Sequence, residues 1–443
     1  MRRLPPLTPL LAPALFTVAL GACVDRTVSR VDPTQDNVET FDVPTVVERD
    51  VDILFVIDSS PSMAEEHAAL RSDFGALLDR LDDGPEGLPN VHLGVVSSDM
   101  GTAPYRASDE CLPDGGDRGL LNGAACAALG GASFIEDVLD IDNTRRTNYS
   151  GTLEAAFGCT ADVGVRGCGF ERHLDAMRTA LSGANPGFVR DDAYLAVVFL
   201  ADEDDCSARD PRLYDPNNTA LGPLSDFRCH AQGIRCENDP DPTAPGPREG
   251  CVPDDDSPYL ESIDTYVDFL VGLKGDEDRV VVAAIVGDPD DVRIGVDAFD
   301  RPAVLAGCPA GGLGASEPGL RFRELLSRFT HSSMSTLCAG DLRAALEEVG
   351  GKIRASTGVM CLSRAIADRN PSLPGVQAEC SMVEELQGGV ETIIPSCDSG
   401  AAAPCWRIVD DTTCSPGFGQ LVIERGGAPA PEDGRIRAQC TVQ

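Results

Sequence analysis

The fold is decided by the stretch Val51-Asp52-Ile53-Leu54-Phe55-Val56-Ile57, which runs directly into Asp58-Ser59-Ser60-Pro61-Ser62. Its first part is a mostly apolar run, typical of a strand buried inside a sheet. Beyond it, apolar side chains recur at helical spacing up to Leu81, so we predict a helix over residues 62–81 that ends at Asp82-Asp83-Gly84-Pro85. A strand followed by a polar loop and an amphipathic helix is the opening unit of an α/β sheet.

The same alternation continues outward along the chain. Further strands are predicted at 91–96, 194–201 and 280–286, with an edge strand at 332–337. Helical spacing predicts helices over 170–181, 260–270, 321–329 and 342–353. The sequence therefore predicts an α/β fold over residues 51–354, a doubly wound, mainly parallel and Rossmann-like sheet with helices on both faces.

Three stretches depart from this alternation. Residues 101–150 and 206–257 lack the alternation, and 206–257 is crowded with Asp, Pro, Gly and four cysteines, so we predict that both are surface insertions held by disulfides. Residues 355–443 carry six cysteines and short β-prone pieces at 406–409 and 420–423. We predict a small, disulfide-rich β-type domain there, because disulfides compensate for a small core.

Seventeen cysteines indicate an oxidising compartment, and the N-terminus agrees with export. Arg2 and Arg3 precede the apolar run 10–20, and Leu20-Gly21-Ala22-Cys23 is similar to a bacterial lipobox. This predicts a signal peptide over 1–22, lipidation of Cys23 and a tether over 23–50. The alternative is an ordinary signal peptide with a chance cysteine. The expected location is the bacterial cell envelope, anchored by lipid to a membrane, the outer one in our interpretation, and facing either the periplasm or the outside.

Without Cys23 the number of cysteines is even, which suits full pairing into disulfides. Neighbours in sequence are expected to pair, such as Cys111 with Cys126 and Cys159 with Cys168. The cysteines at 206, 229, 236 and 251 are expected to cross-link the second insertion. Spacing alone leaves the connectivity of the other cysteines open.

The charge of the chain excludes one class of partner. Acidic residues outnumber basic ones 72 to 36, which gives a net charge of −36. Such a chain lacks the positive surface that grips a phosphate backbone, so nucleic acid is not expected as a partner. Solvation of the surface and the binding of cations both remain open as reasons for the acidity.

Oxygen-bearing side chains gather where the first strand ends. Asp58, Ser60 and Ser62 fall within one loop, before the first helix. In an open α/β sheet ligands bind at the carboxyl ends of the strands, and carboxylate and hydroxyl oxygens suit Mg²⁺ or Mn²⁺. The alternative is a helix cap, for which Ser and Asp are also favoured.

The spacing Asp58-x-Ser60-x-Ser62 after an apolar strand resembles the metal-ion-dependent adhesion site of von Willebrand factor type A (VWA) domains. The resemblance implies a divalent cation, Mg²⁺ first with Mn²⁺ or Ca²⁺ possible, completed by a Thr from a middle loop and an Asp after a later strand. Asp202 fits the latter. Thr160 is the only Thr in the middle segment 159–169, where Val165 stands at the expected place. Glu203, Asp204 and Asp205 are expected to be solvated, or to lie behind the residues that bind the ion, rather than to bind it directly.

The resemblance also implies a function. VWA domains mostly bind other proteins, and an acidic residue of the ligand fills the open metal position. We therefore expect a lipid-anchored binding or adhesion protein, with a metal-independent structural envelope lipoprotein as the alternative. No zinc-protease motif, nucleophile elbow or phosphate-binding loop is present in the sequence, so an enzyme is not expected.

Overall fold

The fold is described from a computed structural model of the chain. The described residues are 38–43, 49–83, 87–140, 144–238, 241–308, 313–357, 360–361, 365–370, 372, 377–386, 390–409, 419–425 and 435–442. The expected signal peptide and the lipidation residue Cys23 lie outside them.

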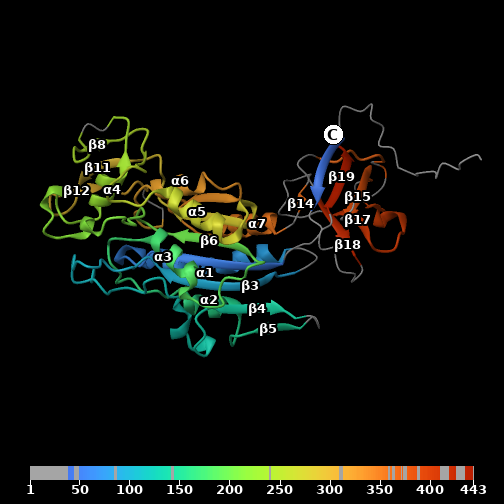
Figure 1. The fold of residues 1–443 in the computed structure, drawn as a ribbon, viewed down its shortest axis with the longest axis horizontal. Helices are drawn as coiled ribbons and strands as arrows, with labels where there is room; N and C mark the ends of the chain where they lie inside the picture. The colour runs from blue at the N-terminus through green and yellow to red at the C-terminus, as the bar shows by residue number, and fades with distance from the viewer. Residues whose placement is uncertain are drawn as a thin grey trace, which may run out of the picture.

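A seven-stranded sheet forms the centre of the molecule, with the order β13-β10-β6-β2-β3-β4-β5 (Figure 1). Five neighbouring strands are parallel, and β4 and β5 continue the sheet in antiparallel pairing. The prediction of a mainly parallel α/β sheet is confirmed. The strands are β2 (Asp50–Ile57), β3 (Asn90–Ser97), β4 (Ile135–Leu139), β5 (Arg145–Thr147), β6 (Tyr194–Leu200), β10 (Val280–Val286) and β13 (Ser332–Thr336).

Helices cover both faces of this sheet because the side chains of its strands alternate between two apolar cores. Ile53 and Phe55 of β2 point into one core, with α1, α2 and α7, whereas Leu54 and Val56 point into the other, with α3, α5 and α6. The helices are α1 (Ala64–Asp82), α2 (Leu153–Thr160), α3 (His173–Thr179), α5 (Ile263–Lys274), α6 (Leu320–Leu326) and α7 (Arg343–Ser356). The sheet is therefore doubly wound.

The first expected insertion is partly a piece of the main sheet. Strands β4 and β5 both lie within residues 101–150, and they form a hairpin that lengthens the sheet beyond β3. The expected disulfides here were wrong: Cys111 pairs with Cys168, and Cys126 pairs with Cys159. Disulfides form between cysteines that are close in the folded chain, and the fold brings the segment around Cys168 next to Cys111 of the insertion.

The second expected insertion, residues 206–257, folds as a small layer beside the sheet. It holds α4 (Phe227–Gly233) and the short strands β7 (Ile234–Arg235), β8 (Gly246–Pro247) and β9 (Val252–Pro253). Strand β8 pairs with β11 (Arg293–Val296), which pairs with β12 (Pro302–Val304). The disulfides Cys206–Cys229 and Cys236–Cys251 cross-link it as expected, and Cys308–Cys338 closes a later loop.

The described residues of the C-terminal region form strands in two sheets. One sheet has the order β1-β19-β15-β16 and the other the order β14-β18-β17. Its strands are β14 (Met360–Cys361), β15 (Cys380–Leu386), β16 (Val390–Ile394), β17 (Cys405–Val409), β18 (Gln420–Glu424) and β19 (Arg435–Thr441). The disulfides Cys380–Cys440 and Cys397–Cys405 lie within it, and every disulfide among the described residues stays within one of the two domains.

Strand β1 (Val38–Val43) differs from the tether that we expected over residues 23–50. It pairs antiparallel with β19, from Val38 opposite Thr441 to Val43 opposite Ile436. Figure 1 shows it as the blue strand beside the red strands of the C-terminal domain. The N-terminal segment thus supplies an edge strand to the domain at the other end of the sequence, and the α/β domain lies between the two in the chain.

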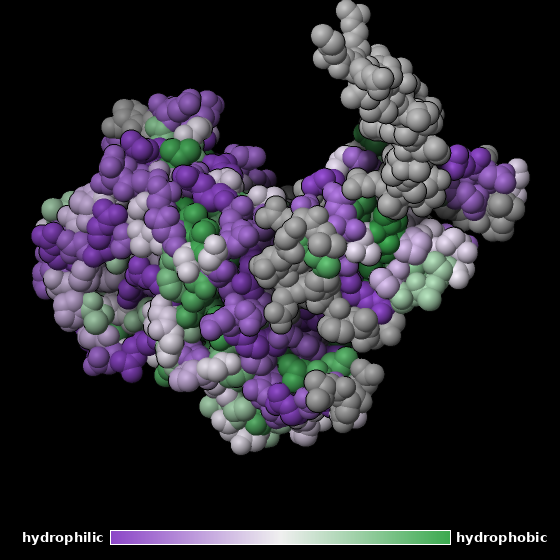
Figure 2. Space-filling view, turned by 45° about the vertical axis from the view of Figure 1, so that its right-hand side comes forward, coloured by the Kyte–Doolittle hydropathy of each residue, from purple (hydrophilic) through white to green (hydrophobic). Residues whose placement is uncertain are grey.

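The surface reflects the acidic composition. The face shown in Figure 2 is largely hydrophilic, with apolar patches that are small and scattered. Within the described part of the chain, no helix has both the length and the apolar character needed to cross a bilayer.

Candidate metal centre

Two neighbouring strands of the sheet place the candidate metal centre at their carboxyl ends. Strand β2 ends at Ile57 and β6 at Leu200, and the Asp58 N–H donates to the Leu200 carbonyl at 2.9 Å. Strands β3 and β6 lie on opposite sides of β2, so the chain order reverses at this point. Such a switch point is where open α/β sheets bind ligands.

The loop after β2 folds back on itself through its own polar groups. The Asp58 Oδ1 accepts a hydrogen bond from the Ser60 N–H at 2.7 Å. The Ser60 and Ser62 hydroxyl oxygens are 2.8 Å apart, and the Ser60 hydroxyl donates to the Asp202 Oδ1 at 3.4 Å. The four residues that the sequence analysis singled out from the ends of two strands therefore meet at one point.

The capping alternative finds no support in this loop. Ser60 precedes the 3-10 turn Pro61–Met63, and α1 follows at Ala64, yet neither start has a side-chain capping hydrogen bond. The hydroxyls of Ser60 and Ser62 face each other and Asp202 instead. This orientation leaves them available as oxygen ligands.

Two buried side chains that the sequence analysis missed join the centre. Asp58, Glu171 and His173 each offer an atom within 4.8 Å of the others. Among the described residues, the one other such trio contains Cys397 and Cys405, which are bonded to each other. The His173 Nε2 lies 3.5 Å from the Asp58 Oδ2, and neither His173 nitrogen has a hydrogen-bond partner among the described residues.

Glu171 lies immediately before α3, in the crossover that leads back to the sheet. One of its oxygens accepts a hydrogen bond from the Ser98 hydroxyl, at the end of β3, and the other has no partner. Its backbone carbonyl accepts from the Cys206 N–H at 2.7 Å. The sequence does show an acidic residue at the start of a predicted crossover helix. We assigned residues 170–181 to that helix and did not consider Glu171 as a ligand.

A further carboxylate approaches from α1. Glu66 is fully buried, and within the described part of the chain neither of its oxygens has a hydrogen-bond partner. Gly314 packs against it so closely that a Cβ on Gly314 would lie 2.1 Å from the Glu66 Oε1. The loop around Gly314 therefore covers this side of the centre.

Crowded burial disfavours the ionised forms of these carboxyl groups. Desolvation and the nearby Asp58 raise the pKa of Asp202 to about 7. The pKa of Glu171 is raised well above its ordinary value by burial and by Asp58, and the pKa of Glu66 is raised chiefly by burial. No Lys or Arg among the described residues forms a salt bridge with Asp58, Glu66, Glu171 or Asp202.

Thr160 is not part of this cluster. It is the last residue of α2, and its hydroxyl donates to the Phe157 carbonyl at 2.9 Å. Among the described residues, no hydrogen bond joins it to Asp58, Ser60, Ser62 or Asp202. Helix α2 directs the Thr160 hydroxyl into its own backbone, and Glu171 is the residue from the segment before α3 that lies beside Asp58.

Of the acidic run after Asp202, Asp204 and Asp205 are bonded within the protein rather than solvated. Asp204 accepts hydrogen bonds from the Leu320 and Arg321 N–H groups at the start of α6. Asp205 is buried and pairs with Arg321 at 3.0 Å. Both residues therefore hold α6 against the end of β6, which is a structural role.

Comparison with known proteins leaves the family open. No protein-family model matches the sequence, and no curated protein matches it. Solved structures give low similarity: the pilus adhesin SpaC from Lactobacillus rhamnosus GG has 10% identity and a TM-score of 0.33 over 96% of this chain and 45% of that one. Proximal thread matrix protein 1 from the mussel byssus has 12% identity and a TM-score of 0.29, with 72% and 48% covered. The pilus adhesin RrgA from Streptococcus pneumoniae has 10% identity and a TM-score of 0.28, with 94% and 60% covered.

This chain thus spans about half the length of the first two of those proteins. Structural similarity at this level supports no conclusion about the fold or the function of this chain.

Proposed function

We propose that this chain is an exported binding protein that holds a divalent metal ion between the ends of β2 and β6 and binds a protein ligand through it. The observation that supports the proposal is a group of four buried carboxylates, Asp58, Glu66, Glu171 and Asp202, which have no Lys or Arg partner among the described residues. Buried charges in proteins are paired or coordinate a metal, because an isolated one is costly. The ion would be held by Asp58, Ser60, Ser62, Glu171 and Asp202, all of them hard oxygen ligands.

The same residues support assignment to the VWA family. The Asp-x-Ser-x-Ser loop follows a buried strand, and Asp202 follows the neighbouring strand across the switch point. Glu171 would take the place that the resemblance gives to a threonine. Mg²⁺ is the ion that the resemblance favours, and Mn²⁺ and Ca²⁺ accept the same ligands.

The carboxylate of Glu171 would change how strongly the bound ion attracts a protein ligand. An acidic side chain of a partner protein would complete the coordination, as the resemblance implies. Each anionic ligand lowers the attraction of a divalent ion for a further anion. We therefore expect the metal to contribute less affinity here than in a site with a neutral threonine, and the surface around the site to contribute more.

The envelope location is part of the proposal and rests on the N-terminal sequence. Lipidation at Cys23 would anchor the chain, and adhesion would follow if the domain faces outward. Mass spectrometry of the N-terminal peptide tests the lipid, and Cys23→Ser should move the protein from the membrane fraction to the soluble fraction. Retention of Cys23→Ser in the membrane would contradict the anchor.

Metal binding is tested directly with Mn²⁺, whose paramagnetic spectrum reports the bound ion. The full chain should bind Mn²⁺, with competition by Mg²⁺, and Asp58→Asn should lower the affinity by at least about tenfold, or 1.4 kcal/mol. Asp192→Asn is the matched control, since Asp192 is exposed on the turn before β6, at the opposite end of that strand from Asp202. Absence of Mn²⁺ binding by the unaltered chain would favour the metal-independent structural lipoprotein.

Ligand binding is tested with the unaltered chain and the Asp58→Asn variant as baits. Capture of a partner from envelope extracts should require the divalent ion and fail with chelator, and the Asp58→Asn bait should fail in both conditions. A partner that binds Asp58→Asn normally would contradict the metal-bridged mechanism even if the chain binds Mn²⁺.

A further inference from the structure

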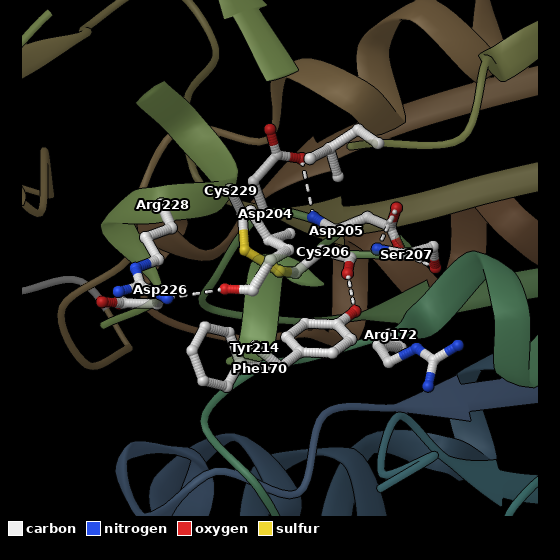
Figure 3. Close-up of a disulfide and its surroundings, with 12 residues drawn as sticks. Phe170, Arg172, Asp204, Asp205, Cys206, Ser207, Tyr214, Asp226, Arg228 and Cys229 are labelled. Atoms are coloured by element: carbon white, nitrogen blue, oxygen red, sulfur yellow. Dashed lines mark hydrogen bonds between the residues drawn. A yellow bond between two sulfur atoms is a disulfide. The ribbon is translucent and has the colours of Figure 1, made fainter. Parts of the chain in front are cut away.

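One disulfide of the α/β domain is more accessible than the others. Of the seven disulfides that the described residues form, every one except Cys308–Cys338 has at least one buried half-cystine. Cys308 and Cys338 are both partly exposed. Figure 3 shows the contrasting case of Cys206–Cys229, which is buried in an apolar cluster with Tyr214. A thiol in solution can therefore reach Cys308–Cys338 more readily.

The loop that this disulfide closes lies against the candidate metal centre. We call residues 313–317, within that loop, the covering segment. The Glu317 N–H donates to the Asp202 carbonyl at 2.7 Å. Gly314 packs against Glu66, since a Cβ on Gly314 would lie 2.1 Å from the Glu66 Oε1. The covering segment therefore contacts both a candidate ligand of the ion and the buried carboxylate from α1.

Two hydrogen bonds of the covering segment lie next to the half-cystines. Gly307, which precedes one of them, donates its N–H to the Ser316 carbonyl at 2.9 Å. Leu337, which precedes the other, accepts from the Leu313 N–H at 3.0 Å. The disulfide thus ties together the two backbone positions that hold the covering segment. Opening it should weaken both hydrogen bonds, because the segments that carry them are then free to move apart.

The Ser316 side chain would stabilise one sulfur as it leaves. Its hydroxyl oxygen lies 2.9 Å from the Cys308 Sγ, and because a disulfide sulfur carries no hydrogen, the hydroxyl is the donor. Ser316 is 1% exposed, so this hydrogen bond is shielded from water. A hydrogen bond to the charged form of a group favours that form, so it would stabilise the Cys308 thiolate. The attacked sulfur is then that of Cys338.

We propose that Cys308–Cys338 is a site of thiol–disulfide exchange that controls the covering segment. A thiolate of a dithiol reductant attacks the Cys338 sulfur, forms a mixed disulfide with it and releases Cys308 as a thiolate. The second thiol of the reductant then attacks the mixed disulfide, releases Cys338 and leaves the reductant as a disulfide. Two electrons pass from the reductant to the protein, and the two protons of the dithiol end on the two cysteines.

Reduction would also act on the metal centre. Movement of the covering segment would let water reach Glu66 and Asp202, which reduces the cost of burial that a bound cation offsets. Loss of the Glu317 hydrogen bond would also leave Asp202 less firmly positioned. The affinity for a divalent ion should therefore fall in the reduced chain. This effect rests on the proposed function, whereas the exchange site itself does not.

The exchange site is tested by titrating the full chain with dithiothreitol, followed by alkylation and peptide mass spectrometry. Cys308 and Cys338 should become alkylated at a dithiothreitol concentration at least about tenfold lower than Cys206 and Cys229. Ser316→Ala should slow this first reduction at least about threefold. Reduction of both disulfides together, or of Cys206–Cys229 first, would overturn the exchange site, and an unchanged rate in Ser316→Ala would overturn Cys308 as the leaving sulfur.

Hydrogen exchange tests the control of the covering segment without relying on metal binding. In the double variant Cys308→Ser, Cys338→Ser, the amides of Leu313 and Glu317 should exchange at least about tenfold faster than in the unaltered chain. Cys397→Ser, Cys405→Ser is the matched control and should leave these amides unchanged, because its disulfide lies in the C-terminal domain. Equal exchange in the unaltered chain and the Cys308→Ser, Cys338→Ser variant would overturn the control of this segment.

Mn²⁺ titration of the same variants separates this inference from the proposed function. The affinity should fall at least about threefold in Cys308→Ser, Cys338→Ser and stay unchanged in the control. Equal Mn²⁺ affinity in all three proteins would overturn the effect on the metal centre. If the unaltered chain binds no Mn²⁺, the proposed function fails, whereas early reduction of Cys308–Cys338 and faster exchange in the covering segment would still support the exchange site.

Discussion

Glu171 is the buried carboxylate that the crossover before α3 adds to the candidate metal centre. It is buried, and it contributes one oxygen bonded to Ser98 and one without a partner. Glu171→Gln should lower the Mn²⁺ affinity of the first centre at least about tenfold, because one anionic ligand is lost while the shape is kept. Glu154→Gln, on the exposed side of α2, is the control that should leave the affinity unchanged. Unchanged Mn²⁺ affinity in Glu171→Gln would place this residue outside the coordination shell.

The raised pKa values predict how stability depends on pH. The folded pKa of Asp202 is about 7 and its ordinary value is 3.8, so between these values the folded state binds more protons than the unfolded one. Without metal, the free energy of unfolding should therefore fall as the pH rises from about 4 to 7. A divalent ion offsets the repulsion, so the fall should be smaller in excess Mg²⁺.

Thermal unfolding in chelator and in Mg²⁺, across pH 5 to 8, measures this difference. Asp202→Asn should flatten the curve in chelator, since the titrating group is gone. A metal-free chain whose stability rises steadily over this range would show that other groups dominate.

The turn that backs the metal loop makes a prediction at the level of elements. Gly167 donates its N–H to the Ser59 carbonyl at 2.9 Å, and a Cβ there would lie 2.0 Å from the Ser59 hydroxyl oxygen. Gly167→Ala should displace the loop after β2, at a cost of about 1–3 kcal/mol in the free energy of unfolding. Gly169→Ala is the matched control, because no atom lies within 4 Å of the added Cβ.

Denaturant unfolding and Mn²⁺ titration of the two variants give the comparison. Both stability and Mn²⁺ affinity should fall in Gly167→Ala and stay within about 0.5 kcal/mol of the unaltered chain in Gly169→Ala. If Gly167→Ala kept full Mn²⁺ affinity, the close packing against Ser59 would have no part in shaping the centre.

The elements differ in how well the sequence predicted them, and the reason is physical. Strands β6 and β10 were found almost to the residue because both faces are buried, which makes the runs continuously apolar. The eight-residue helix α2 was missed because so short a segment shows little periodicity. Strand β1 was missed because its partner β19 lies at the other end of the chain.

The candidate site was predictable in part for a similar reason. Asp58, Ser60, Ser62 and Asp202 follow recognisable strands, so parallel pairing brings them to one edge. Glu171 and His173 come from a crossover whose path depends on the disulfide between Cys111 and Cys168 and on tertiary packing. Sequence spacing holds no information on that path.

At the scale of the whole molecule, β1 joins the beginning of the chain to its end. Replacing residues 38–43 with Gly and Ser should remove the edge strand of the C-terminal domain and leave the α/β domain intact. Backbone amides of β19 should then exchange with solvent at least about tenfold faster, or 1.4 kcal/mol in opening free energy. Mn²⁺ binding should not change. Unchanged exchange in β19 would mean that β1 adds no stability there.

The pairing of β1 with β19 also sets an order of events while the chain is synthesised. Strand β1 is made before the α/β domain and its partner β19 after it, so β1 stays unpaired while the α/β domain is completed. Contacts between such distant segments form slowly, because the intervening loop must first be closed. Once the α/β domain has folded, the chain between β1 and the C-terminal strands spans only the distance between the two ends of that domain. Pairing of β1 with β19 should therefore occur only after the α/β domain has folded.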